Sequence, residues 1–157
     1  MLAAAGVAML LVSRSIVAAP VTALPFSKDL RQEAMGPVGP RLVVVLFSLP
    51  DCPYCEVIRR EQLLPLSREP RAEKQLVVRE VSITGARSFI GFDGGPTSES
   101  DFAKRSAAQF SPIVAFFGPT GEQVSEPIVG ALLADFYGAY LDRAVHTGLS
   151  KIEGMHR

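Results

Sequence analysis

The strongest constraint in this sequence is a pair of cysteines that directly follows an apolar run. The run, Leu42 to Phe47, is rich in β-branched residues and predicts a strand covered on both faces. Cys52 and Cys55 are the only cysteines of the chain, and they stand three positions apart where a helix is predicted to begin. Pro53 suits the first helical turn, because the N–H group that it lacks has no partner there. A buried strand, a tight turn and two thiols on the first turn of a helix indicate redox chemistry.

The spacing of the cysteines also predicts their roles. A disulfide between Cys52 and Cys55 would close a small ring, which removes little entropy from the unfolded chain and makes a poor structural link. The N–H groups and the dipole at a helix N-terminus favour an anion, so we expect the pKa of Cys52 to lie roughly 1 to 5 units below the value of about 8.5 of a free cysteine. Cys52 is predicted to be the nucleophile, with the charge of Asp51 moderating the shift. Cys55 is predicted to resolve the mixed disulfide, and Tyr54 to contact an incoming polypeptide.

Composition limits the partners of the chain. Its 157 residues suit one domain with terminal extensions. The formal net charge is zero and the charged residues, 20% of the chain, form no long run of one sign, so neither nucleic acid nor an anionic membrane surface is an expected partner. Trp is absent, so no surface of aromatic and basic residues that could stack nucleic-acid bases is indicated.

The first residues, MLAAAGVAMLLV, are typical of the apolar core of an export signal. They are apolar over about a dozen positions, fewer than the roughly 20 that a spanning helix needs. Small residues follow, and cleavage is predicted after Ala23, in the sequence Val21-Thr22-Ala23, which gives a periplasmic or secreted protein. No Lys or Arg precedes Arg14, although a signal normally begins with positive charge. An uncleaved membrane anchor and a buried N-terminal helix are the alternatives.

The first half of the chain alternates helices and strands. A short amphipathic helix is predicted over Leu24 to Ala34, capped by Ser27, and a Gly- and Pro-rich linker follows it. After the cysteines, a helical stripe is kinked or ended by Pro65. Alternation of residue types then predicts a strand over Glu73 to Ile83.

The second half is predicted to contain one long loop, one helix, a hairpin and a closing helix. The segment Thr84 to Ser100 is rich in Gly, Ser and Pro and is expected to be a long excursion. A helix capped by Asp101 runs to about Gln109, and the strands of the hairpin are Ile113 to Phe117 and Glu122 to Val129. The last helix ends near Gly148 and carries an apolar stripe of core or half-buried side chains: Leu133, Phe136, Tyr137, Tyr140, Leu141 and Ala144. This order predicts an α/β fold with a mixed central sheet and helices on both faces.

The motifs around the cysteines resemble those of the thioredoxin superfamily. The resemblance covers roughly Arg41 to Val145 and rests on a strand before Cys-Pro-Tyr-Cys, the pair Ser111-Pro112 before a strand, a Gly-bearing hairpin turn, and Val129-Gly130-Ala131-Leu132 before the last helix. It implies a thioredoxin-like fold in which Pro112 is cis, faces the redox pair and, with Ser111, receives the substrate backbone. The two residues between the cysteines are similar to those of glutaredoxins. The export signal is closer to periplasmic thioredoxin-like proteins, among them the small thioredoxins of bacterial sulfur-oxidation systems.

The sequence departs from cytosolic thioredoxins at two places near the cysteines. Asp51 stands where those proteins have Trp, and Leu46 and Phe47 occupy the region in which a buried acidic residue is expected. Proton transfer at Cys55 would then need water or another group. The expected division is a signal in 1–23, a helix and linker in 24–40, a thioredoxin-like domain in 41–148 and a flexible tail in 149–157. Nothing before Arg41 is long enough for a dimerisation domain, so a monomer is expected.

The sequence therefore predicts an exported thiol-disulfide oxidoreductase. No cofactor is expected, because the redox group is the Cys52–Cys55 disulfide itself. The resemblance to sulfur-oxidation thioredoxins favours a reductant, with a membrane thiol reductase as electron donor and periplasmic proteins with disulfides or thiols as partners. A disulfide oxidase or isomerase is one alternative. A copper-binding module is another, because soft thiolates suit Cu(I). A structural zinc site needs four ligands, and only His146 and His156 are present besides carboxylates, so no metal is expected.

Overall fold

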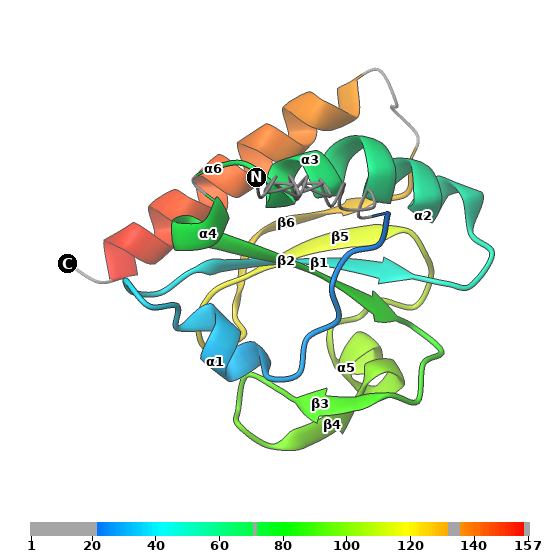
Figure 1. Cartoon of the computed structure of the whole chain (residues 1–157), viewed down its shortest axis with the longest axis horizontal. Coiled ribbons are helices and arrows are strands. Elements are labelled where there is room, and N and C mark those ends of the chain that lie inside the picture. Colours follow the sequence, from blue (N-terminus) through cyan, green and yellow to red (C-terminus); the bar gives the residue numbers. More distant parts are fainter. Residues whose placement is uncertain (1–21, 71, 132–135, 156–157) are drawn as a thin grey trace, which may run out of the picture.

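The fold is built on a four-stranded mixed sheet (Figure 1). The computed structural model describes residues 22–70, 72–131 and 136–155. The strand order is β2-β1-β5-β6, with β1 parallel to β2 and antiparallel to β5, and β5 antiparallel to β6. The strands span β1 (Leu42–Ser48), β2 (Leu76–Ser82), β5 (Ile113–Phe117) and β6 (Gln123–Val129). The predicted α/β class with a mixed central sheet is confirmed, and the strand before the cysteines lies inside the sheet as expected.

Helices cover both faces of this sheet. Figure 1 places α2 (Pro53–Ile58), α3 (Leu64–Ser67) and α6 (Tyr137–Met155) above it, and α1 (Leu30–Ala34) and α5 (Glu99–Arg105) below it. Every residue of β1 is buried, and its side chains alternate between two apolar cores. The core on the α2 side includes Leu42, Val44 and Leu46, and that on the α5 side includes Val43, Val45 and Phe47. This double coverage explains why the strand is apolar at successive positions.

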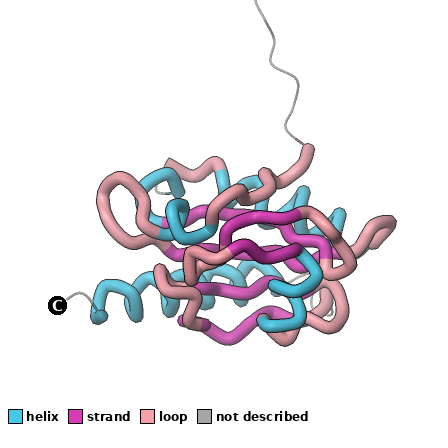
Figure 2. Tube along the Cα trace, turned by 90° about the horizontal axis from the view of Figure 1, so that it is seen from below, coloured by secondary structure: helices cyan, strands magenta, loops and turns pink. Residues whose placement is uncertain are grey.

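The excursion after β2 contains a small hairpin that was predicted only as a loop. Its strands are β3 (Ser88–Ile90) and β4 (Pro96–Ser98), which pair antiparallel in a separate sheet. The view from below turns this face of the molecule toward the reader (Figure 2). Phe89 lies 5.5 Å from Phe102 of α5, and Phe92 lies 5.6 Å from Phe117 of β5, measured between ring centroids. Packing of these aromatic rings against one another fixes the excursion on the main sheet.

The helix that follows the cysteines changes its winding before Pro65. After α2, residues Arg59–Leu63 form a π-helical turn, and α3 then begins with Pro65 in its first turn. A proline lacks the N–H group and its ring clashes with the carbonyl four residues earlier, so a wider turn in front of it relieves the conflict. The predicted kink at Pro65 therefore takes the form of this turn.

The predicted starts of α1 and α5 are wrong by a few residues, and α1 is described first. Helix α1 begins at Leu30 and not at Leu24, because the Asp29 Oδ1 atom accepts the N–H of Gln32 at 2.8 Å, while Ser27 donates to Glu33.

Helix α5 begins at Glu99 and ends at Arg105, short of the predicted Gln109. Its N-cap is Ser98 and not Asp101: the Ser98 hydroxyl accepts the Asp101 N–H at 3.2 Å and donates to the Asp101 carboxylate at 2.7 Å. That second hydrogen bond lowers the pKa of Asp101.

The predicted end of the last helix and the start of β2 are also wrong. Helix α6 continues through Gly148 to Met155, and Ile152 in the predicted tail is buried. Phe136 and Tyr140, predicted as core or half-buried, are exposed, whereas Tyr137 is buried, and burial raises its pKa. A short helix, α4 (Ala72–Gln75), occupies the first part of the predicted strand from Glu73, so β2 begins only at Leu76.

Some predictions fall outside the described residues. These are the export signal up to Val21, Leu132 of the motif before the last helix, Leu133 of that helix, and His156. In the parts of the chain that the structure describes, no helix combines the length and apolar character needed to cross a membrane.

Candidate redox site

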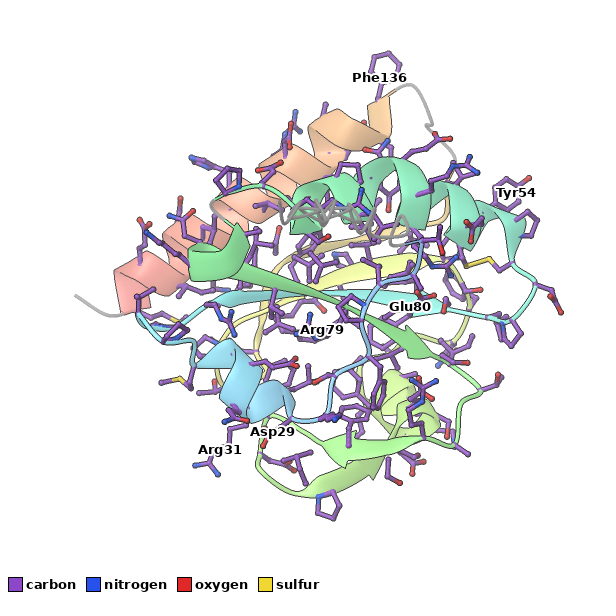
Figure 3. The ribbon with its side chains drawn as sticks, in the orientation of Figure 1. Asp29, Arg31, Tyr54, Arg79, Glu80 and Phe136 are labelled. Carbon is purple, nitrogen blue, oxygen red and sulfur yellow. A yellow bond between two sulfur atoms is a disulfide. The ribbon has the colours of Figure 1, made fainter. Side chains whose placement is uncertain are left out.

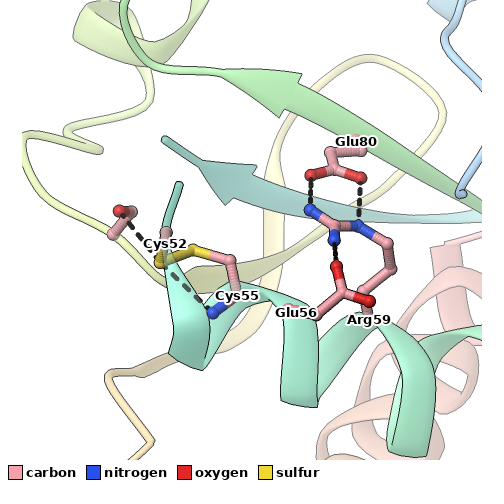
Figure 4. The surroundings of a disulfide bond; sticks show 6 residues. Cys52, Cys55, Glu56, Arg59 and Glu80 are labelled. Carbon is pink, nitrogen blue, oxygen red and sulfur yellow. Dashed lines mark hydrogen bonds and ion pairs between the residues drawn. A yellow bond between two sulfur atoms is a disulfide. The ribbon is translucent and has the colours of Figure 1, made fainter. Parts of the chain in front are cut away.

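A disulfide bond joins Cys52 and Cys55, whose Cα atoms lie 5.3 Å apart (Figure 4). Cys52 is the N-cap of α2, and its Sγ atom accepts the backbone N–H of Cys55 at 3.2 Å. Cys52 is partly exposed, whereas Cys55 is fully buried. Of the two cysteines, only Cys52 is therefore open to an incoming thiol or disulfide.

Asp51 holds a backbone conformation that few residues tolerate. Its φ of 56° lies in the left-handed region, in the turn that brings the chain from β1 into α2. Asp and Asn enter this region more readily than aromatic or β-branched residues, because their short polar side chains bond locally. This local geometry gives a physical reason for Asp at the position where the resembling family has Trp.

The structure brings the pair Ser111-Pro112 against the cysteines. The Ser111 hydroxyl donates to the Sγ atom of Cys52 at 3.8 Å, across a separation of 59 residues. The peptide bond between Ser111 and Pro112 is cis, as the resemblance implies. The carbonyl of Pro112, at the start of β5, accepts the N–H of Gly130 at 2.8 Å, which ties this corner to the end of β6. Both predicted halves of the site are thus adjacent.

Apolar side chains are exposed on the segments that form the site. Tyr54, 64% exposed, points outward from the start of α2 at the right-hand end of Figure 3. Phe110, directly before Ser111, is 55% exposed, and Val129, directly before Gly130, is 48% exposed. Of these three, only Tyr54 was predicted from the sequence as a contact for a polypeptide. Phe110 and Val129 could have been predicted as further contacts, because they stand next to Ser111 and Gly130 in the sequence.

The structure also places an acidic residue in the cleft that Cys52 lines, on the strand that neighbours β1. Glu80 of β2 pairs in register with Leu46 of β1, in the region where the resemblance led us to expect a buried acid. Both oxygens of its carboxylate accept hydrogen bonds from the Arg59 guanidinium, at 2.8 and 2.5 Å (Figure 4). Arg59 also forms an ion pair with Glu56. The hydrogen bonds to Glu80 are the main cause that raises the pKa of Arg59.

A cavity of about 700 Å³ opens beside Cys52 and contains this acidic residue. Its apolar wall includes Leu24 and Phe26, from the segment that precedes α1. Its charged side chains are of both signs: Asp51, Glu56, Arg59, Glu80, Arg87 and Glu99. Glu99 is buried and accepts the N–H of Ser82 at 3.1 Å, and Arg87 lies over the Phe26 ring. The chemistry at Cys52 would therefore take place next to a charged cleft.

The described residues do not add metal ligands to the two thiols. Within residues 22–70, 72–131 and 136–155, no three or more His, Cys, Asp or Glu side chains form a group that could hold a metal ion. His146 lies on the exposed side of α6.

Comparisons with known proteins agree with this fold. Residues 29–144 match the family described as thioredoxin-like domain. A search of curated proteins finds no match. Among solved structures, the thioredoxin of Malassezia sympodialis (Mala s 13) is 19% identical with a TM-score of 0.52, over 79% of this chain and 91% of that chain. A thioredoxin-fold protein from Helicobacter pylori is 17% identical with a TM-score of 0.44, over 72% of this chain and 83% of that chain. Since the family match spans most of the sequence, the chain belongs to the thioredoxin-like domain family.

Proposed function

We propose that this protein is a thiol-disulfide oxidoreductase that acts through a mixed disulfide at Cys52, resolved by Cys55. Membership of the thioredoxin-like domain family, together with a cysteine pair at disulfide distance, supports a thiol-disulfide oxidoreductase in general. The roles of nucleophile for Cys52 and resolving thiol for Cys55 are assigned from their difference in burial. Cys52 is partly exposed and Cys55 is fully buried. The nucleophile must reach the substrate, whereas the resolving thiol needs to reach only its neighbour.

The proposed cycle transfers two electrons from the reduced cysteine pair to a substrate disulfide. The Cys52 thiolate attacks one substrate sulfur, and the other substrate sulfur leaves as a thiolate. Cys55 then loses its proton and attacks the Sγ atom of Cys52. This step forms the Cys52–Cys55 bond, breaks the mixed disulfide and releases the second substrate thiolate. The substrate gains two electrons and the cysteine pair becomes the disulfide.

A polypeptide substrate would dock on the surface around Cys52. Ser111 and Pro112 are the proposed contacts for its backbone, supported by the hydrogen bond from Ser111 to the Sγ atom of Cys52. Tyr54 is the proposed apolar contact, and the exposure of Phe110 and Val129 on the adjoining segments extends that surface. The aromatic side chains of Tyr54 and Phe110 offer apolar area at low conformational entropy cost.

The proposed direction of electron flow is reduction of partner-protein disulfides in the periplasm or outside the cell. Its support is the resemblance to the small thioredoxins of sulfur-oxidation systems and the apolar N-terminal segment of the sequence. In an oxidising compartment such a protein needs a continuous supply of electrons, for which a membrane thiol reductase is the proposed donor.

The reduction potential of the Cys52–Cys55 couple tests the direction. Equilibration with a thiol-disulfide buffer, followed by alkylation and mass spectrometry, gives the fraction of protein oxidised at each ratio. A reductant is expected near about −270 mV, and a value near about −120 mV would contradict the proposal in favour of an oxidase. Reduction of insulin disulfides should accompany the first result and should be abolished in Cys52→Ser.

A further inference from the structure

The cavity beside Cys52 is distinct from the surface on which the substrate backbone is proposed to dock. Its walls include Cys52 but neither Ser111 nor Pro112. The two regions meet at one sulfur, since the Ser111 hydroxyl donates to the Sγ atom of Cys52. A polypeptide held at Ser111-Pro112 with its own cysteine at Cys52 therefore has this cavity next to it. Side chains that flank the substrate cysteine can enter the cavity.

The cavity carries more negative than positive charge. Its charged groups are four carboxylates and two guanidinium groups, from Asp51, Glu56, Glu80, Glu99, Arg59 and Arg87. With all six ionised, two positive charges against four negative charges leave a net charge of −2. Arg59 is shared between two of the carboxylates, since it bonds both oxygens of Glu80 and pairs with Glu56 (Figure 4). A cleft with an excess of one sign attracts groups of the opposite sign.

Glu99 is a buried carboxylate in the wall of this cavity, with one oxygen incompletely paired. Its side chain is 7% exposed, and its Oε1 atom accepts the N–H of Ser82 at 3.1 Å. No hydrogen bond reaches its Oε2 atom from the residues that the structure describes. The ion pair at Oε2 is long: the Nε atom of Arg87 lies 4.0 Å away, on a side chain that is 60% exposed. A buried carboxylate gains from a close cationic partner, so Oε2 is a suitable contact for a second cation.

Part of the cavity wall is apolar. Leu24 and Phe26 come from the segment before α1, and Leu49 and Pro50 come from the turn after β1. The guanidinium carbon of Arg87 lies 4.2 Å from the centroid of the Phe26 ring, so this ring already stacks with a cation. Lys and Arg combine a long apolar stem with a charged head. Apolar walls and an excess of negative charge together fit a side chain of this class.

We propose that this cavity receives a Lys or Arg side chain of a polypeptide substrate, so that the protein acts preferentially on disulfides whose cysteines lie near basic residues. The inference rests on the proposed thiol-disulfide exchange and adds the class of substrate. The charged head pairs with the Glu99 carboxylate, and the stem packs on Leu24 and Phe26. Arg87 competes with the substrate for the same carboxylate. An acidic side chain at the same place is repelled.

The test compares peptides that differ only in the charge near their cysteine. Each peptide has a single cysteine, joined by a disulfide to thionitrobenzoate, and the residues two positions before and after it are both Lys, both Gln or both Glu. The Cys52 thiolate of the reduced full-length chain attacks the peptide sulfur. A disulfide between Cys52 and the peptide forms, the disulfide of the probe breaks, and thionitrobenzoate leaves with the electron pair as a coloured thiolate. Stopped-flow absorbance gives the second-order rate constant.

The quantity that decides is the ratio of the rate constants of the Lys and Glu peptides. At low salt this ratio is expected to be on the order of ten, with the Gln peptide between the two. It should fall as salt is added, because ions screen the charges. Both peptides react with the same thiol, so the ratio within one variant does not depend on the intrinsic reactivity of Cys52.

Two variants change the charge of the cavity in opposite directions. In Glu99→Gln the amide oxygen can still accept the Ser82 N–H but the charge is lost, so the ratio should fall roughly threefold. In Arg87→Gln the competing guanidinium is lost, and the ratio should rise. The matched control is Glu33→Gln, which removes a carboxylate that pairs with Arg79 outside the cavity. This control is expected to leave the ratio unchanged.

Several results would overturn the inference. These are equal rates for the Lys and Glu peptides in the wild-type protein, an unchanged ratio in Glu99→Gln, or an equal fall in Glu33→Gln. Circular dichroism identifies any variant that fails to fold. If Glu99→Gln does not fold, Arg87→Gln and the salt dependence of the wild-type ratio decide, and a ratio that does not rise in Arg87→Gln contradicts the inference.

The same measurements separate this inference from the proposed function. If all three peptides react with Cys52 at the same rate, the preference for basic substrates is absent and the exchange chemistry stands. If no peptide reacts with the folded, reduced wild-type protein, the proposed function itself is contradicted.

Discussion

Ala107 adopts a backbone conformation that usually belongs to glycine. Its φ is 56°, and the residue directly follows the C-cap of α5. The N–H of Ala107 bonds to the carbonyl of Lys104, and the N–H of Ala108 bonds to that of Ala103, which is the Schellman arrangement of a helix end. Glycine is the common residue at this position, because a Cβ atom there costs roughly 1–2 kcal/mol.

Ala107→Gly is therefore expected to stabilise the protein. Relief of the left-handed conformation outweighs the greater entropy of an unfolded glycine, and the net gain should be about 0.5–1 kcal/mol. Urea denaturation of the oxidised protein measures it. Ala139→Gly, at an exposed helical position in α6, is the control and should destabilise by up to about 1 kcal/mol. A loss of stability in Ala107→Gly would contradict this description of the helix end.

At the scale of elements, the last helix shows why some boundaries could not be predicted from the sequence. Gly148 has the form of a helix stop signal, yet α6 continues through it. In the fold, a Cβ atom at Gly148 would lie 2.8 Å from Leu42 Cδ1 and 3.2 Å from Val124 Cγ2. The glycine thus allows α6 to approach β1 and β6 closely, and this requirement appears only once the elements pack. The strand β5 had the predicted bounds, because Pro112 and Gly118 enclose a continuous apolar run.

Two glycines of α6 are expected to respond in opposite ways to the same change. Gly148→Ala should destabilise the protein by roughly 1–2 kcal/mol, because overpacking against Leu42 exceeds the gain in helix propensity. Gly154→Ala should be neutral or stabilise by up to about 1 kcal/mol, since nothing lies within 4 Å of the added Cβ atom. Thermal unfolding of both variants compares them directly. Stabilisation by Gly148→Ala would show that the helix does not pack as described.

At the scale of the whole molecule, the sequence predicted those parts of the candidate site that are local motifs. The cysteine pair and Ser111-Pro112 are short motifs, and their meeting follows once the strand order is given. The Arg59–Glu80 pair could not be predicted, because it depends on the parallel register of β1 and β2 and on the position of α2 above them. The hairpin of β3 and β4 was missed for a similar reason: its strands are short, and Phe packing fixes them in place.

The central claim is that Cys52 forms the mixed disulfide and Cys55 resolves it. The most direct measurement is mass spectrometry of reduced Cys55→Ser after incubation with a disulfide-linked peptide, with Cys52→Ser as the matched control. Because Cys55 is buried and Cys52 is partly exposed, Cys55→Ser should accumulate a peptide adduct on Cys52, and Cys52→Ser should form almost none. If folded Cys55→Ser forms no adduct, or if Cys52→Ser forms as much on Cys55, the account is contradicted.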